Sequence, residues 1–198
     1  MNTILIKKVK NYCTNILINS RCKSLPFHSV QHTLEVFENV QIIGKYKDIS
    51  EEDLEILKIA ALFHDTGISQ NFVGHENIST SYASTYLSEL NFPNKNMNQV
   101  LNCIKSTQMP QNPKTPIEKI ICDVDLFHLA AKNYLFKNEL LRNEWQTYMN
   151  LKFTDADWYQ LNLDFLSKHK YHTMYGKKKL EKGKNKNIIL LENLLSIN

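Results

Sequence analysis

The residues most able to carry chemistry are histidines and aspartates that recur along the chain. His64 and Asp65 are adjacent, His32 precedes them, and the segment CDVD (122–125) follows. Imidazole nitrogens and carboxylate oxygens bind divalent first-row metals, and such a metal polarises a phosphoryl oxygen and lowers the pKa of bound water. These residue types therefore point to metal-dependent hydrolysis, provided that the fold brings them together.

The sequence before His64 and Asp65 explains why this pair is unusual. Residues 54–65, LEILKIAALFHD, are almost wholly apolar, which is typical of a buried central helix, and Gly67 is expected to supply its C-terminal stop. An ionised carboxylate at the end of such a helix costs several kcal/mol unless it is compensated. Both side chains could converge on one ion at this helix end, or they could form a cap that faces solvent.

His32 is the natural third ligand because it lies on a predicted helix whose apolar positions include Val36, Val40 and Ile43. The alternative is a histidine that only packs in the core. A fourth ligand should be an oxygen from Asp123 or Asp125. At 100° per residue, Asp125 falls about 80° from Ile117, at the edge of the apolar face of its helix, whereas Asp123 falls about 120° away on the other side. Asp125 is therefore the better candidate, and Asp123 is expected to support a ligand or face the surface.

A site made of His32, His64, Asp65 and Asp125 suits one divalent metal ion: Mn, Fe, Co, Ni, Zn or Mg. It contains no thiolate, so a closed structural zinc site is not expected. Four protein ligands in an octahedral shell would leave positions open for water and substrate.

The elements that must position these residues are predicted to be helices. Only five Gly and five Pro occur in 198 residues, and no convincing alternating strand pattern is present. We expect an all-α fold: a single-domain bundle of about eight helices spanning 1–198, with a core at about 27–130 and C-terminal helices at 134–195 packed on it. Strong helix starts are predicted at Ser50, Thr115 and Thr154.

The bulk composition restricts the setting. The net charge of +4 is mild and is concentrated near the C-terminus, so nucleic-acid binding is not favoured. The four cysteines form no CxxC pair, and the N-terminus does not resemble a secretory signal. No run of residues reaches the length of a membrane span. These features predict a cytoplasmic protein that does not bind membranes and is a monomer or a homodimer.

The order of these motifs resembles the HD superfamily of metal-dependent phosphohydrolases. FHSVQHTLEV (27–36) is similar to its first motif, LKIAALFHDTG (57–67) to its central helix, GHENIS (74–79) to the following segment, and PIEKIICDVDL (116–126) to its last motif. The stretch 165–187 is similar to a bacterial subgroup of HD phosphohydrolases. A more distant likeness links the chain to cyclic-nucleotide phosphodiesterases.

The resemblance implies hydrolysis of a phosphate ester in a nucleotide or related small molecule. Asp65 or Asp125 would orient or deprotonate the attacking water. His28 matches the position from which a histidine protonates the leaving oxygen, although a histidine at a helix start could equally cap the helix or face water. The alternative function is a non-catalytic, nucleotide- or metal-binding signalling module, and an oxygenase on a dinuclear iron site is a further possibility.

The same resemblance suggests which residues bind the substrate. Relatives with two metals carry two further histidines; His75 matches one, but residues 104–110 contain none, so a second metal is not expected. His75 could bind phosphate instead, with Glu76 orienting it. The remaining predicted substrate contacts are Lys105, Thr107, His169 and Tyr171.

Overall fold

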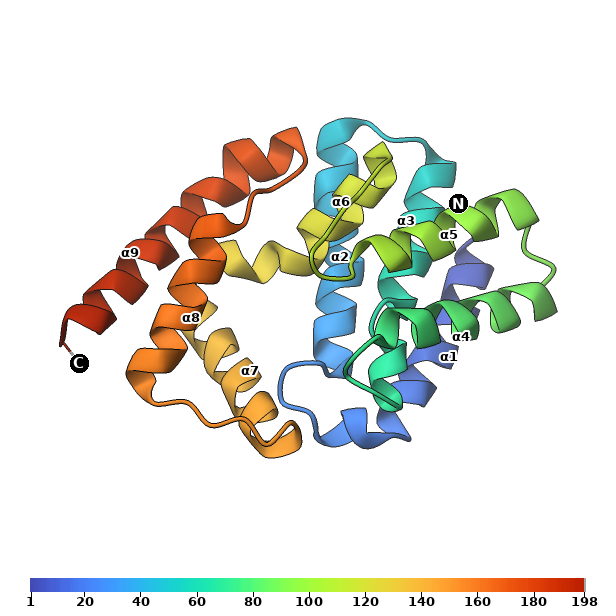
Figure 1. The fold of residues 1–198 in the computed structure, drawn as a ribbon. Helices are drawn as coiled ribbons and strands as arrows, with labels where there is room; N and C mark the ends of the chain where they lie inside the picture. Colours follow the sequence, from blue (N-terminus) through green and yellow to red (C-terminus); the bar gives the residue numbers. More distant parts are fainter. Residues whose placement is uncertain (198) are drawn as a thin grey trace. The chain divides into compact units, whose positions relative to one another are not determined.

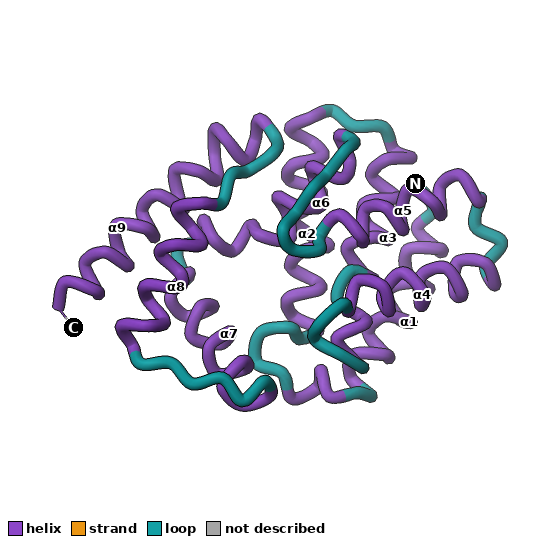
Figure 2. The backbone as a smooth tube through the Cα atoms, viewed as in Figure 1, coloured by secondary structure: helices purple, strands orange, loops and turns teal. Residues whose placement is uncertain are grey.

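The computed structural model describes residues 1–197, and the regular structure of these residues is entirely helical (Figure 1). Nine α-helices are joined by short loops and single helical turns, and residues 1–197 contain no strand (Figure 2). The predicted all-α class is confirmed, with a number of helices close to the expected eight. Within this range, no helix has both the length and the apolar character needed to cross a membrane.

The chain forms two compact units, Met1–Asp125 and Leu126–Asn198. All predicted metal ligands lie in the first unit. Its helices are α1 (Thr3–Ile18), α2 (Val30–Lys47), α3 (Glu51–Phe63), α4 (His75–Glu89), α5 (Asn94–Ser106) and α6 (Pro116–Asp125), with 3-10 turns η1 (Arg21–Ser24) and η2 (Thr66–Ser69).

Helix α3 is the centre of the first unit, as its apolar sequence predicts. It packs against α1, α2, α5 and α6, and every residue from Ile56 to Phe63 is buried. A helix surrounded on all sides must be apolar on all sides. His64 and Asp65, which directly follow α3, consequently lie in the interior.

Side-chain caps fix where the helices next to the site begin. The Ser50 hydroxyl accepts a hydrogen bond from the Asp53 amide at 3.0 Å and starts α3. At α6, the Glu118 carboxylate accepts from the Thr115 amide while the Thr115 hydroxyl accepts from the Glu118 amide, both at 3.3 Å. This reciprocal pair satisfies amides that the first helical turn leaves open. Both predicted helix starts are confirmed, and with them the phase of the helices that carry His64 and Asp125.

The second unit contains η3 (Leu126–Ala130), α7 (Tyr134–Tyr148), α8 (Asp155–Lys168), a π-helical turn at Gly176–Leu180 and α9 (Glu181–Ile197). Its core includes Leu129, Tyr134, Leu166 and Leu191. Thr154 and Asp157 form the capping box of α8, which confirms the third predicted helix start. The expectation that these helices belong to one domain with the HD core stays a prediction.

Candidate metal centre

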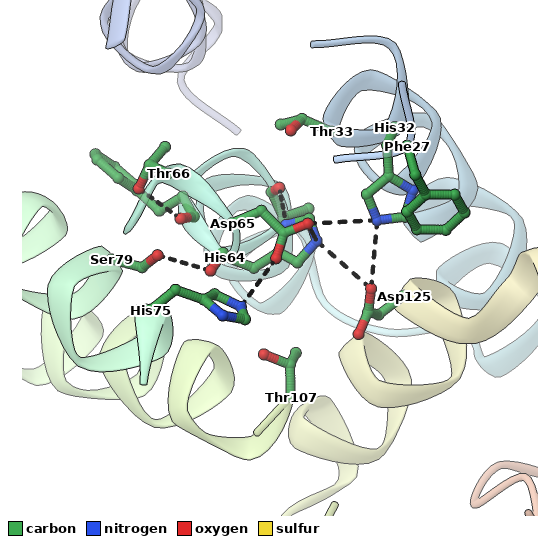
Figure 3. Close-up of polar contacts among 12 residues, drawn as sticks. Phe27, His32, Thr33, His64, Asp65, Thr66, His75, Ser79, Thr107 and Asp125 are labelled. Atoms are coloured by element: carbon green, nitrogen blue, oxygen red, sulfur yellow. Dashed lines mark hydrogen bonds and ion pairs between the residues drawn. The ribbon is translucent and has the colours of Figure 1, made fainter. Parts of the chain in front are cut away.

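Three separate segments bring the four predicted ligands together (Figure 3). His32 lies in the first turn of α2, His64 caps the C-terminus of α3 with Asp65 directly after it, and Asp125 is the last residue of α6. One ligand atom from each of His32, His64 and Asp125 lies within 4.8 Å of the other two, a grouping that could hold a metal ion.

Asp65 completes this cluster. Its Oδ2 lies 3.1 Å from His64 Nε2 and 3.5 Å from His32 Nε2, while Asp125 Oδ1 lies 3.5 Å from each of the same two nitrogens. Two imidazoles and two carboxylates therefore surround one point. His32 and Asp125 lie far apart in the sequence, so their 3.5 Å separation is a product of the fold.

The atoms of the cluster suit a metal better than they suit one another. His64 Nδ1 lies 2.8 Å from the Ala61 carbonyl oxygen, which can only accept, so Nδ1 carries a proton and Nε2 faces the cluster. His64 Nε2 and Asp65 Oδ2 are buried and, within the described chain, make no aligned hydrogen bond despite their 3.1 Å separation. Bonds of about 2.1 Å to one ion would place neighbouring ligand atoms about 3.0–3.4 Å apart. The observed separations of 3.1–3.5 Å lie close to this range.

The charges in the cluster depend on one another. Burial by itself would lower the pKa of His64, but the carboxylates of Asp65 and Asp125 outweigh burial and raise it well above 6.5. Burial likewise would raise the pKa of Asp65, and the His64 charge instead lowers it well below its usual range. The pKa of Asp125 is also lowered, because His32 and His64 overcome its burial. Both carboxylates thus favour the ionised form that metal binding requires, and a metal would take the place of the His64 proton.

The turn that carries Asp65 is locked against α4. The Ser79 hydroxyl donates to the His64 carbonyl at 2.7 Å and accepts from the Gly67 amide at 2.8 Å. A Cβ on Gly67 would overlap the backbone carbonyl of His75 and lie 2.8 Å from the Ser79 nitrogen. Gly67 was expected to stop helix α3, and this was wrong: α3 ends at Phe63, and Gly67 has no left-handed conformation. The glycine is required because α4 approaches so closely.

His75 contacts the other oxygen of Asp65. His75 Nε2 lies 3.3 Å from Asp65 Oδ1, and its Nδ1 donates to the Phe72 carbonyl at 2.8 Å. Burial would lower the pKa of His75, but the hydrogen bond to Asp65, the Asp65 charge, the Phe72 carbonyl and Glu76 raise it to about 9. This raised pKa favours the cationic form of His75 at neutral pH, and the side chain keeps 19% of its surface exposed beside the cluster.

The other predicted residues of the first unit lie at different distances from the cluster. The His28 ring lies 5.9 Å from the His32 ring in the loop before α2, and Phe27 packs against both rings. Thr107 caps α5 and is buried on the side of the cluster, where its hydroxyl donates to Ile104 (Figure 3). Lys105 is exposed, because residues two positions apart on a helix point in different directions.

His169 and Tyr171 lie in the second unit, where their rings pack edge to face at 4.7 Å. The Tyr171 hydroxyl donates to the Leu126 carbonyl at 3.2 Å. Burial, together with Lys184 and His172, lowers the pKa of His169 to about 4, so this imidazole is neutral at pH 7. Their predicted role in substrate binding stays a prediction.

The sequence predicted the residues that converge in this cluster but not the residues that hold them in place. Asp123 is fully buried, which excludes the surface position considered for it. Ser79 contacts His64, and Phe27 contacts His32. Both lie in motifs from which only the histidines were predicted to have a role. Because both are ordinary core-type residues, the only signal that could have found them was their position within those motifs.

An all-helical unit with a buried cluster of two histidines and two aspartates defines a class of helical metal-binding domains. A family model of the HD domain matches residues 30–130, about half of the chain, and the chain belongs to this family. HD domains are generally those of metal-dependent phosphohydrolases. No curated protein and no solved structure gave a match.

Proposed function

We propose that this protein is a metal-dependent phosphohydrolase, or phosphodiesterase, that hydrolyses a phosphate ester of a nucleotide or a related small molecule. The observation that carries the proposal is the convergence of His32, His64 and Asp125 in an HD domain, with Asp65 Oδ2 3.1–3.5 Å from the two histidines and with His64 Nε2 and Asp65 Oδ2 buried without a hydrogen bond in the described chain. One divalent ion held there would polarise a phosphoryl oxygen and lower the pKa of a bound water.

The residues around the ion have distinct proposed roles. Asp65 or Asp125 accepts the proton of the attacking water, because both carboxylates stay ionised despite burial. The water oxygen forms a bond to phosphorus as the bond to the leaving oxygen breaks. His28 gives its proton to that oxygen, since its ring lies 5.9 Å from the ring of His32, beside the cluster. The products are an alcohol or nucleoside and a phosphate or phosphomonoester.

Substrate contacts are proposed on the His75 side of the cluster. His75 is cationic and Thr107 offers a hydroxyl oxygen nearby, so the two could bind the phosphate and the organic part of the same ester. Lys105, His169 and Tyr171 are retained as further candidates. A cytoplasmic location, a monomeric or homodimeric state and a single metal ion are proposed on sequence grounds.

The test is a hydrolysis assay on metal-stripped protein reloaded separately with Mn, Co, Ni, Mg or Zn. The substrate panel contains a bis-aryl phosphodiester, an aryl phosphomonoester, nucleoside mono- and triphosphates and cyclic nucleotides. Asp65→Ala serves as the ligand variant, and Asp164→Ala, exposed on α8, serves as its matched control.

Metal-dependent turnover that Asp65→Ala abolishes and Asp164→Ala preserves would support the proposal. Stoichiometric metal binding without turnover of any substrate would instead favour the non-catalytic binding module. Metal-dependent oxygen consumption would favour an oxygenase.

A further inference from the structure

Arg21 makes an unusual set of contacts outside the metal cluster. It begins the short turn η1, and its Nε donates to the backbone carbonyl of Ile68 at 2.6 Å. The centre of its guanidinium lies 4.2 Å from the centroid of the Phe72 ring. One side chain thus contacts both Ile68 and Phe72 in the segment 66–74, which joins Asp65 to His75.

Each of these two points is one hydrogen bond away from a site residue. The Ile68 amide donates to the Asp65 carbonyl at 3.0 Å, and the Phe72 carbonyl accepts from His75 Nδ1 at 2.8 Å. Asp65 and His75 then meet at 3.3 Å. The result is a closed ring of contacts in which Arg21 lies opposite the cluster.

The chemistry of the arginine suggests that packing alone does not account for it. Ile68 and Phe72 lie in an apolar cluster with Leu17 and Leu25, where a hydrocarbon side chain would also pack well. Within residues 1–197, the buried Arg21 Nη2 has no hydrogen-bond partner, and burying an unpaired donor is unfavourable. Local rules are usually broken in this way where a residue has a second role. What a hydrocarbon could not supply is the simultaneous hydrogen bond and planar stack.

We infer that Arg21 is a positioning residue that fixes the segment 66–74 and thereby directs His75 toward Asp65. The inference rests on the proposed function for its importance to catalysis, but not for its effect on the structure. Without the guanidinium, the Ile68 carbonyl loses its donor and the Phe72 ring loses its stacked partner, so this segment opens more often. His75 and Asp65, at its two ends, become less well oriented together.

The first experiment measures hydrogen exchange of the metal-free protein by mass spectrometry. The variants are Arg21→Met, Arg21→Lys, and Lys23→Met as a matched control, because Lys23 is an exposed cation on the same turn. We expect amides of residues 66–75 to exchange about tenfold faster in Arg21→Met, as befits the loss of one charge-assisted hydrogen bond. Arg21→Lys should keep part of the protection that Arg21→Met loses, because lysine still has a hydrogen-bond donor but has no planar guanidinium to stack on Phe72. Lys23→Met should match wild type.

Unchanged exchange at 66–75 in a folded Arg21→Met protein would overturn the inference, as would equal acceleration over the whole chain. Should Arg21→Met not fold, a wild-type exchange pattern in Arg21→Lys would also overturn it.

The second experiment titrates the same proteins with Co²⁺ and records the visible absorption of the bound ion, which reports on its ligands. Arg21→Met should bind Co²⁺ about tenfold more weakly, in the range found when groups that orient metal ligands are lost. Its kcat for any substrate found should fall more than its KM rises, and Arg21→Lys should recover part of kcat. Faster exchange at 66–75 in Arg21→Met, together with a wild-type protein that binds Co²⁺ but hydrolyses nothing, would support the role of Arg21 and overturn the proposed function. The two can therefore fail separately.

Discussion

Replacing Asp65 with asparagine isolates the contribution of one negative charge to metal binding. The substitution preserves the size of the side chain, and the amide oxygen can still approach the two imidazoles that now lie 3.1 and 3.5 Å from Oδ2. Asp125 and both histidines remain. The cluster therefore keeps its shape and loses half of its carboxylate charge.

The size of the effect follows from the geometry. At an effective dielectric constant of about 20, the carboxylate charge of Asp65 and each unit of charge on an ion about 3 Å away interact by about 5 kcal/mol. Part of this is regained, because the neutral amide is easier to bury and its oxygen still binds weakly. We expect a net loss of about 3 kcal/mol, which weakens metal binding between about 100-fold and 200-fold.

The assay is competition between the protein and a chelating dye for Mn²⁺ or Co²⁺ at one fixed pH. Asp164→Asn, a change on the exposed surface of α8, should bind the ion as wild type does. Circular dichroism and thermal unfolding establish that each variant is folded. A folded Asp65→Asn protein that binds the ion within twofold of wild type would refute the assignment of Asp65 as a ligand.

Three further changes probe the site and its surroundings. His28→Gln should lower kcat by about 100-fold with unchanged metal affinity, because general acid catalysis contributes at least that much. Gly67→Ala should lower the free energy of unfolding by about 3 kcal/mol or more, since the new methyl group meets the backbone of α4. His169→Gln should reduce the loss of folding stability at acid pH. The pKa of His169 is about 4 in the folded protein and 6.5 in the unfolded chain, so the unfolded chain binds the proton more readily. This contribution is fully present above pH 6.5 and is lost as pH falls toward 4, by about 2 kcal/mol after allowance for partial exposure.

The controls follow from the same structure. Gly74 has a φ of 71° and open space around it, so Gly74→Ala should cost only about 1 kcal/mol in urea unfolding. Equal losses for the two alanines would contradict the close approach at Gly67. Lys170→Gln, next to His169 and exposed, should keep the acid sensitivity of wild type. A steady-state assay in which His28→Gln is fully active would remove this histidine from the mechanism.

Residue type and helical phase were sufficient to predict much of the site. The apolar segment 54–65 predicted a central helix because a helix without a polar face is buried, and α3 is indeed buried from Ile56 to Phe63. The 100° spacing of helical residues selected Asp125 over Asp123, and Asp125 Oδ1 lies 3.5 Å from both His32 Nε2 and His64 Nε2. These inferences succeeded because they depend on local periodicity, which the sequence contains directly.

The supports of the site depend on contacts that no local pattern encodes. Arg21 reaches a carbonyl 47 residues away, and Ser79 bonds to His64 across 15 residues. Gly67 was interpreted as a helix stop because glycine is common there, whereas its actual cause is a neighbouring helix that the sequence does not reveal as a neighbour. The tertiary partner, rather than the chain position, determined each of these three roles.

The two oxygens of Asp65 face different groups, one the His32–His64 pair and the other His75. In the proposed function a single carboxylate would therefore be shared between the ion and the phosphate, and an anion that draws His75 away would alter the charge that Asp65 offers the ion. Thermodynamic reciprocity then requires the ion to change anion affinity by the same factor. For the proposed enzyme, metal occupancy and product retention would form one linked equilibrium, in which the concentration of free phosphate would change how strongly the protein keeps its metal.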